Sequence, residues 1–104
     1  MERYNSRTID ELGRLVLHTD LRQRLGLETG GKISLKHVDT IVIMQPVEDD
    51  AESDAAVCKV DELGRIVLPI ELRQKLGWRE KDKLALYHTD NIIILKQAEI
   101  SPAL

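Results

Sequence analysis

The sequence is poor in aromatic residues and in cysteine. Tryptophan and tyrosine supply all of its 3% aromatic content, because phenylalanine is absent. Proteins that bind single-stranded nucleic acid stack the bases on aromatic rings, so this scarcity argues against a single-stranded target. Cys58 is the only cysteine, which excludes an intrachain disulfide and fits a reducing compartment. We interpret it as a half-buried strand residue rather than a reactive thiol.

Long apolar segments and catalytic motifs are missing as well. No stretch approaches the roughly 20 apolar residues that a membrane span requires, and the polar N-terminus does not resemble a signal peptide. We therefore expect a soluble, cytoplasmic protein. The sequence contains no glycine-rich phosphate loop, no zinc-spaced cysteines and histidines, and no nucleophile elbow. We expect no catalytic residues, no metal and no cofactor.

The most informative feature that is present is a tandem repeat. The segment 10–14, Asp-Glu-Leu-Gly-Arg, returns at 61–65, and the residues that follow stay in register without a gap. Each copy has only about 40 residues, which is too short for a stable domain without disulfides, a metal or a partner. We therefore predict that residues 1–46 and 57–97 are two repeats that complete one core. Residues 98–104 would form a short tail.

An acidic linker separates the repeats and explains the negative charge of the chain. Residues 47–56 carry five acidic and no basic groups, whereas residues 1–46 carry seven basic and six acidic groups and residues 57–104 carry eight and seven. Exposed charges are screened beyond about 8 Å at physiological salt, so the linker need not cancel a basic patch elsewhere. When extended, the linker reaches roughly 33 Å, which lets the repeats pair within one chain.

Both repeats predict the same order of elements. The expected strands lie at 7–10, 14–17, 32–38 and 40–45 in the first repeat, and at 57–61, 65–68, 83–89 and 91–96 in the second. A tight glycine turn is expected between the first two strands of each repeat. Short helices, each ended by a glycine, are expected at 20–25 and 70–76, the first with Thr19 as N-cap and the second with Pro69 as its first residue. The last strands are apolar at every position of 41–44 and 92–95, which predicts cover on both faces.

Arginines at equivalent positions of the repeats suggest a binding surface. Arg14 and Arg65 begin the second strand of each repeat, and Arg22 and Arg73 lie on the short helix. The planar guanidinium binds phosphate bidentately and can address guanine edges. We expect the acidic residues of the preceding turn to be ion-pair partners that orient these arginines rather than catalytic acids. The alternative is that the arginines only make the surface soluble.

The segment 59–77, Lys-Val-Asp-Glu-Leu-Gly-Arg-Ile-Val-Leu-Pro-Ile-Glu-Leu-Arg-Gln-Lys-Leu-Gly, resembles the AbrB/SpoVT/MazE family of DNA-binding domains, most of all its AbrB branch. The match continues at 80–82 and 93–96, and the first repeat follows it more loosely. The resemblance implies a mainly β fold with short helices, in which two interleaved repeats form a swapped-hairpin barrel. It also implies a bacterial-type regulator of transcription that binds double-stranded DNA.

The resemblance also implies which residues contact DNA. They are Arg7, Arg14, Arg22, Lys59, Arg65 and Arg73. The sequence departs from the family pattern at several positions. Cys58 stands in the second repeat where Arg7 stands in the first, Gln23 and Gln74 replace a further arginine, and His18 replaces a proline. These departures predict a binding face that is asymmetric and weaker.

Two other functions stay open on the sequence. A MazE-like antitoxin would bind a toxin through a C-terminal extension and regulate itself through DNA binding, but the tail after residue 97 is short and has few apolar anchors. A barrel that serves only for assembly would show no salt-dependent DNA binding. The sequence leaves open whether the repeats pair within one chain, as we expect, or between the chains of a homo-oligomer.

Overall fold

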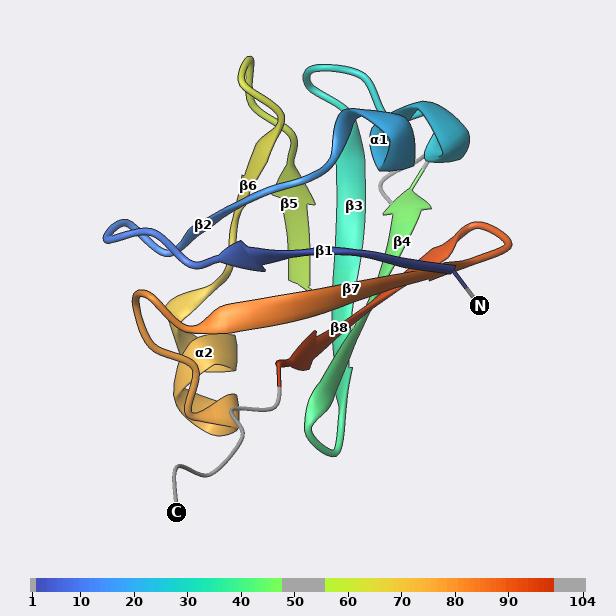
Figure 1. The fold of residues 1–104 in the computed structure, drawn as a ribbon. Coiled ribbons are helices and arrows are strands. Elements are labelled where there is room, and N and C mark those ends of the chain that lie inside the picture. Colours follow the sequence, from blue (N-terminus) through green and yellow to red (C-terminus); the bar gives the residue numbers. More distant parts are fainter. Residues whose placement is uncertain (1, 48–55, 99–104) are drawn as a thin grey trace.

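A computed structural model describes residues 2–47 and 56–98 of the chain (Figure 1). The first half contains β1 (Glu2–Thr8), β2 (Arg14–Val16), α1 (Thr19–Leu25), β3 (Lys32–Val38) and β4 (Ile41–Val47). The second half repeats this order with β5 (Ala56–Lys59), β6 (Arg65–Val67), α2 (Ile70–Leu76), β7 (Lys83–Thr89) and β8 (Ile92–Gln97). Most of the predicted acidic linker, at 48–55, and the tail from residue 99 lie outside the described residues.

Strands of one half pair with strands of the other. A six-stranded antiparallel sheet has the order β1-β7-β8-β4-β3-β5, so that β1 pairs with β7, β4 with β8 and β5 with β3. β2 and β6 pair with each other in a separate two-stranded ribbon. Figure 1 shows the two halves interleaved, with α1 and α2 at opposite ends of the molecule. The predicted mainly β, swapped-hairpin barrel is confirmed, and its strands pair within one chain.

The two halves share one hydrophobic core. Leu15 and Ile66 lie directly opposite each other in the ribbon and are both buried. Val42 of β4 and Leu95 of β8 are likewise opposite and fully buried. Among the described residues, no polar or charged side chain is buried. Because the two members of each pair come from different halves, neither half can complete the core alone. Neither of the two helices described is long and apolar enough to cross a membrane.

The last strand of each half is covered on one face only. In β4, Val42 and Met44 are buried while Ile41 and Ile43 are half-buried, and β8 shows the same alternation. The prediction of cover on both faces is therefore wrong. One face of the antiparallel sheet packs on the core, and the outward isoleucines shield one another across strands, as Ile43 does with Ile94.

The helix boundaries correct two details of the sequence interpretation. Thr19 is the first helical residue of α1, and His18 occupies the N-cap position with φ −57° and ψ 140°. Pro69 occupies the same position before α2, with φ −56° and ψ 139°, so it precedes the helix instead of starting it. A residue that joins a strand directly to a helix keeps an extended ψ, and the fixed φ of proline suits this position. Gly26 and Gly77 end the helices as predicted.

His18 lies beside Tyr4 and Arg7 at the rim of the core. Its imidazole centroid is 5.3 Å from the ring centroid of Tyr4, and both of its ring nitrogens are buried. Desolvation and the charge of Arg7 lower the pKa of His18, while the backbone of Asn5 and the charge of Asp20 raise it. The net direction is downward, so the folded protein favours the neutral imidazole.

The loop between helix and hairpin differs between the halves. Gly30 has φ 83°, and its counterpart Lys81 adopts nearly the same left-handed conformation with φ 73°. Both residues form a backbone hydrogen bond to the other half of the chain. The Lys81 N–H donates to the Ile9 carbonyl at 2.7 Å, and the Gly30 N–H donates to the Val60 carbonyl at 2.8 Å. A residue with a Cβ is strained in this region, by roughly 1–2 kcal/mol. The second half therefore carries strain that the first half avoids.

We predict that His18→Pro makes the protein less sensitive to acid. Above the ordinary His pKa of 6.5 both folded and unfolded states are neutral at this site, and below it the unfolded state binds more protons. Wild-type stability should therefore fall as pH drops from about 7.5 to about 5.5. Proline removes this loss, and it also rigidifies the unfolded chain, which contributes about 0.4–1 kcal/mol. Urea unfolding at both pH values should show a larger advantage for the variant at the lower pH. An equal advantage at both would contradict titration of His18.

We predict that Lys81→Gly stabilises the protein by about 1 kcal/mol, because glycine adopts the left-handed conformation without strain. Thermal unfolding should register this as a rise of roughly 4–8 °C in Tm. Lys81→Ala is the matched control, since it removes the charge and keeps the Cβ. A similar rise in the alanine variant would show that the lysine side chain, and not backbone strain, is responsible.

Candidate nucleic-acid interface

An aspartate organises the turn that leads into each strand of the ribbon. Oδ1 of Asp10 accepts the backbone N–H groups of Leu12 at 2.9 Å and of Arg14 at 2.8 Å, and Oδ2 accepts Nε of Arg14 at 2.7 Å. Asp61 makes the same three bonds in the second half, where its ion pair with Arg65 is also 2.7 Å long. These carboxylates are the predicted ion-pair partners of the ribbon arginines.

The hydrogen bonds of these turns also keep the carboxylates ionised. The backbone N–H of Arg14, and then its guanidinium, lower the pKa of Asp10 and outweigh the opposing effect of desolvation. The pKa of Asp61 is lowered by Arg65 in the same way. Both ion pairs therefore persist well below neutral pH, and the orientation of the two guanidiniums does not depend on small changes in acidity.

The helix arginines cross over to the turns of the other half. The guanidinium of Arg73 covers Gly13 so closely that a Cβ on this glycine would lie 2.7 Å from the Arg73 Cζ. Arg22 covers Gly64 in the same way, at 2.6 Å. Nε of each arginine donates to the carbonyl of the leucine five residues earlier, at 3.0 Å for Arg73 and 3.3 Å for Arg22. A side chain at either turn would displace the guanidinium, and the φ of 76° at Gly13 and 77° at Gly64 favours glycine independently.

The result is two arginine pairs, each built from both halves. Arg14 directly follows the glycine that Arg73 covers, and Arg65 directly follows the glycine that Arg22 covers. We call Arg14 with Arg73 the first arginine pair and Arg65 with Arg22 the second. Since β2 and β6 are antiparallel, the pairs lie at opposite ends of the ribbon. In each pair the two arginines carry one positive charge more than their aspartate, and the neighbouring Glu11 or Glu62 of the same turn offsets this charge.

The structure places the other two predicted residues apart from these pairs. Arg7 lies on β1 opposite Leu84, where it is half-buried and its Nε is buried. Lys59 is exposed at the end of β5, opposite Lys32. Neither belongs to the ribbon or to the helices that cover its turns. The part of Arg7 and Lys59 in nucleic-acid binding therefore remains a prediction from the family pattern.

Cys58, the counterpart of Arg7, has a structural environment. Its Sγ–H donates to the carbonyl of Val67 at 3.0 Å, which links β5 to the ribbon. Burial raises the pKa of this thiol, and the side chain is half-buried. The interpretation of Cys58 as a half-buried strand residue is confirmed.

The ribbon also exposes two residues that the sequence interpretation missed. While Leu15 and Ile66 point into the core, Val16 and Val67 point outward together with the two ribbon arginines. Val16 is 39% exposed and Val67 is 52% exposed. The alternation of side chains along a strand could have indicated this outward position, but only once the pairing of β2 with β6 was known.

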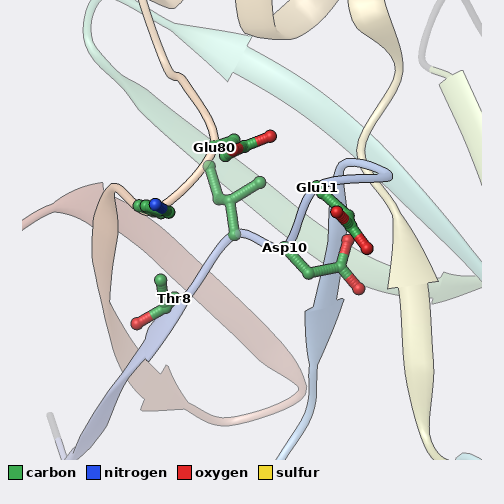
Figure 2. A pocket seen from close by; sticks show the side chains of 6 residues that line it. Thr8, Asp10, Glu11 and Glu80 are labelled. Atoms are coloured by element: carbon green, nitrogen blue, oxygen red, sulfur yellow. The ribbon is translucent and has the colours of Figure 1, made fainter.

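A shallow hollow beside the first turn has the wrong charge for phosphate. Figure 2 shows Thr8, Asp10, Glu11 and Glu80 around it, and Ile9 and Lys81 complete its lining. Half of these six residues are acidic, and the Asp10 carboxylate already pairs with Arg14. Within the described segments, no three His, Cys, Asp or Glu side chains are grouped so that they could hold a metal ion.

Known proteins match parts of this sequence. Residues 57–101 match the protein family described as "Antidote-toxin recognition MazE, bacterial antitoxin". A segment of 46 residues is 59% identical to "Transition state regulatory protein AbrB" of Bacillus subtilis (strain 168), over 44% of this chain and 48% of that protein. The similarity to Abh of the same organism is 50% over 46 residues, covering 44% of this chain and 50% of Abh. The chain thus spans about half the length of these curated relatives.

The fold has a counterpart among solved structures. The solution structure of PHS018 from Pyrococcus horikoshii superposes with a TM-score of 0.52 and covers 96% of this chain and 100% of that chain. The two sequences are 16% identical, so this likeness concerns the fold alone. The sequence matches identify an AbrB-like domain of the MazE/AbrB type within this chain, at residues 57–101.

Proposed function

We propose that the protein is a transcriptional regulator of the AbrB type that grips double-stranded DNA with arginines from both halves. The observation that carries this proposal is the cross-over of Arg22 and Arg73, which places two arginines at each end of one exposed ribbon. The similarity to a transition state regulatory protein supports the regulatory part of the proposal. We assign no catalytic role to any residue.

The arrangement suits a duplex because it repeats with approximate two-fold symmetry. Two-fold DNA-binding proteins contact two half-sites, and here the two arginine pairs stand where two subunits would otherwise place theirs. Guanidiniums bind phosphate oxygens as bidentate donors, and such contacts fix position on the duplex without reading its sequence. The halves are unequal because Cys58 stands at the repeat position equivalent to Arg7, and Pro69 at the position equivalent to His18. We therefore expect the two half-sites to be bound with unequal strength.

The arginines are held in place before DNA arrives. Each ribbon arginine forms an ion pair with its aspartate. Each helix arginine donates a hydrogen bond to a backbone carbonyl and packs against a glycine. Ordering a rotamer-rich side chain on binding costs about 0.5–1.5 kcal/mol, so the preformed pairs save part of this cost. If four to six phosphates are neutralised, log affinity should fall against log salt concentration with a slope of roughly −4 to −5.

We predict that Arg14→Ala combined with Arg65→Ala weakens DNA binding about 100-fold and reduces the magnitude of the salt slope by about two. Fluorescence anisotropy with a labelled A/T-rich promoter duplex over a range of salt concentrations would measure both. The matched control is Lys36→Ala combined with Lys96→Ala, which removes the same charge from exposed positions near the β3–β4 hairpin turn. An unchanged affinity in the folded arginine variant would refute the proposed interface.

We predict that Gly13→Ala weakens DNA binding although it removes no charge. The new Cβ would lie 2.7 Å from the Arg73 Cζ and would push this guanidinium off the turn. Gly26→Ala is the matched control, since Gly26 has a similar φ of 66° and open space where its Cβ would stand. Both variants should lose a similar stability of roughly 1–2 kcal/mol, but only Gly13→Ala should lose affinity. If both bind DNA as the wild type does, the position of Arg73 over the turn has no part in binding.

A second candidate function is a MazE-like antitoxin that binds a toxin and also contacts DNA. The description of the matched family, which names toxin recognition, is the observation that favours it. The predicted tail that would supply such contacts lies largely outside the described residues. Co-purification of a small nuclease with the tagged full-length chain from its native cells, followed by inhibition of that nuclease by the pure protein, would support this function. A purely assembling barrel would instead show no salt-dependent DNA binding.

A further inference from the structure

We infer that Val16 and Val67 contact the 5-methyl groups of thymines in the major groove, so that the ribbon contributes base preference as well as affinity. This inference rests on the proposed function, because it requires that the ribbon face DNA. Single exposed apolar side chains are common on protein surfaces and need no explanation. These two are notable because they share one small surface with the arginine pairs.

The register of the ribbon fixes how valines and arginines alternate on its outer face. Arg14 lies opposite Val67, and Val16 lies opposite Arg65, with the buried residues of the ribbon between these two rows. Directly opposite residues of an antiparallel pair have Cβ atoms about 4.5–5.5 Å apart, and diagonal neighbours are about 7–8 Å apart. The outer face is therefore a four-cornered surface with valines on one diagonal and arginines on the other.

The size and chemistry of this surface match the major groove. The groove is about 12 Å wide and admits a two-stranded β-ribbon. The guanidiniums of Arg14 and Arg65 pair with the aspartates of the turns, at the two ends of the ribbon. When the arginine pairs contact the phosphates, the two valines on the other diagonal of the outer face can therefore meet the base edges. The thymine methyl is the apolar group on those edges, and an aliphatic side chain contacts it without leaving a hydrogen bond unmade. Because the valines are related by the approximate two-fold symmetry, we expect one preferred thymine on each DNA strand.

Burial of one methyl group against a valine should strengthen binding about 4-fold, and both together roughly 15-fold. The probe is a duplex selected from a random pool for tight binding to the full chain, made once with thymine and once with deoxyuridine at every thymine position. Uracil keeps the hydrogen-bonding edge of thymine and lacks its methyl group. Anisotropy titrations at one fixed salt concentration should show roughly 15-fold weaker binding of the wild type to the uracil duplex.

The variant with Val16→Ala and Val67→Ala should bind the thymine duplex as weakly as the wild type binds the uracil duplex. The double variant should also bind the two duplexes equally. If the methyl groups acted only through the shape of the DNA, the variant would still bind the uracil duplex more weakly. Val38→Ala is the matched control, since Val38 is 42% exposed at the β3–β4 hairpin turn, and it should discriminate as the wild type does. Thermal unfolding would confirm that each variant is folded, and Val16→Ser with Val67→Ser, which removes both γ-methyl groups of each valine, would replace a variant that is not.

The outcomes separate this inference from the function on which it rests. Equal, salt-dependent binding of both duplexes by the wild type would overturn the role of the valines and leave DNA binding intact. Discrimination that survives in the double variant would also overturn it, because another residue would then read the methyl groups. If neither duplex is bound in a salt-dependent way, the proposed function itself fails.

Discussion

The pairing of β2 with β6 is the contact on which the rest of this molecule depends. It joins the halves through Leu15 and Ile66, which lie opposite each other and are buried in the common core. The same register turns the ribbon arginines and valines outward, and it brings each glycine turn under the helix arginine of the other half. One short antiparallel pairing thus decides which side chains of the ribbon enter the core and which reach the surface together. Unpairing the ribbon would dismantle the interface and expose Leu15 and Ile66.

Covalent duplication gives the protein a two-fold arrangement without identical halves. In a dimer of one repeat, equivalent positions would carry the same residue. In this chain they differ: His18 corresponds to Pro69, Arg7 to Cys58 and Gly30 to Lys81. Both arginine pairs keep the same ion pair, glycine contact and backbone bond. They differ in one hydrogen bond, which Nη2 of Arg22 donates to Oγ1 of Thr19 at 3.2 Å and which Ile70 cannot accept from Arg73. The two halves thus share most contacts of the arginine pairs and differ in the residues around them.

Much of the architecture could be predicted because it follows from local pattern. The repeat, the glycine turns, the helix stops and the limits of the hairpin strands depend on residues close in sequence, and the acidic turn residues find their arginine partners only four positions away. The predictions failed where distant segments decide the outcome. The apolar last strands appeared to need cover on both faces, but cross-strand contacts such as Ile43 with Ile94 shield the outer one. Thr19 and Pro69 were misplaced by one position because the strand runs directly into the helix.

Composition and the repeat period alone show two equivalent units and the arginines that recur between them, and they predict that neither unit is stable on its own. Which arginines meet depends on the tertiary structure. Arg73 lies beside Arg14, and Arg22 beside Arg65, because the strands of the two halves are exchanged. The members of the first pair are 59 positions apart (73 minus 14) and those of the second are 43 apart (65 minus 22), so no local pattern encodes these pairs. The outward position of Val16 and Val67 has the same origin, since the face that a strand residue occupies is set by what its neighbour buries.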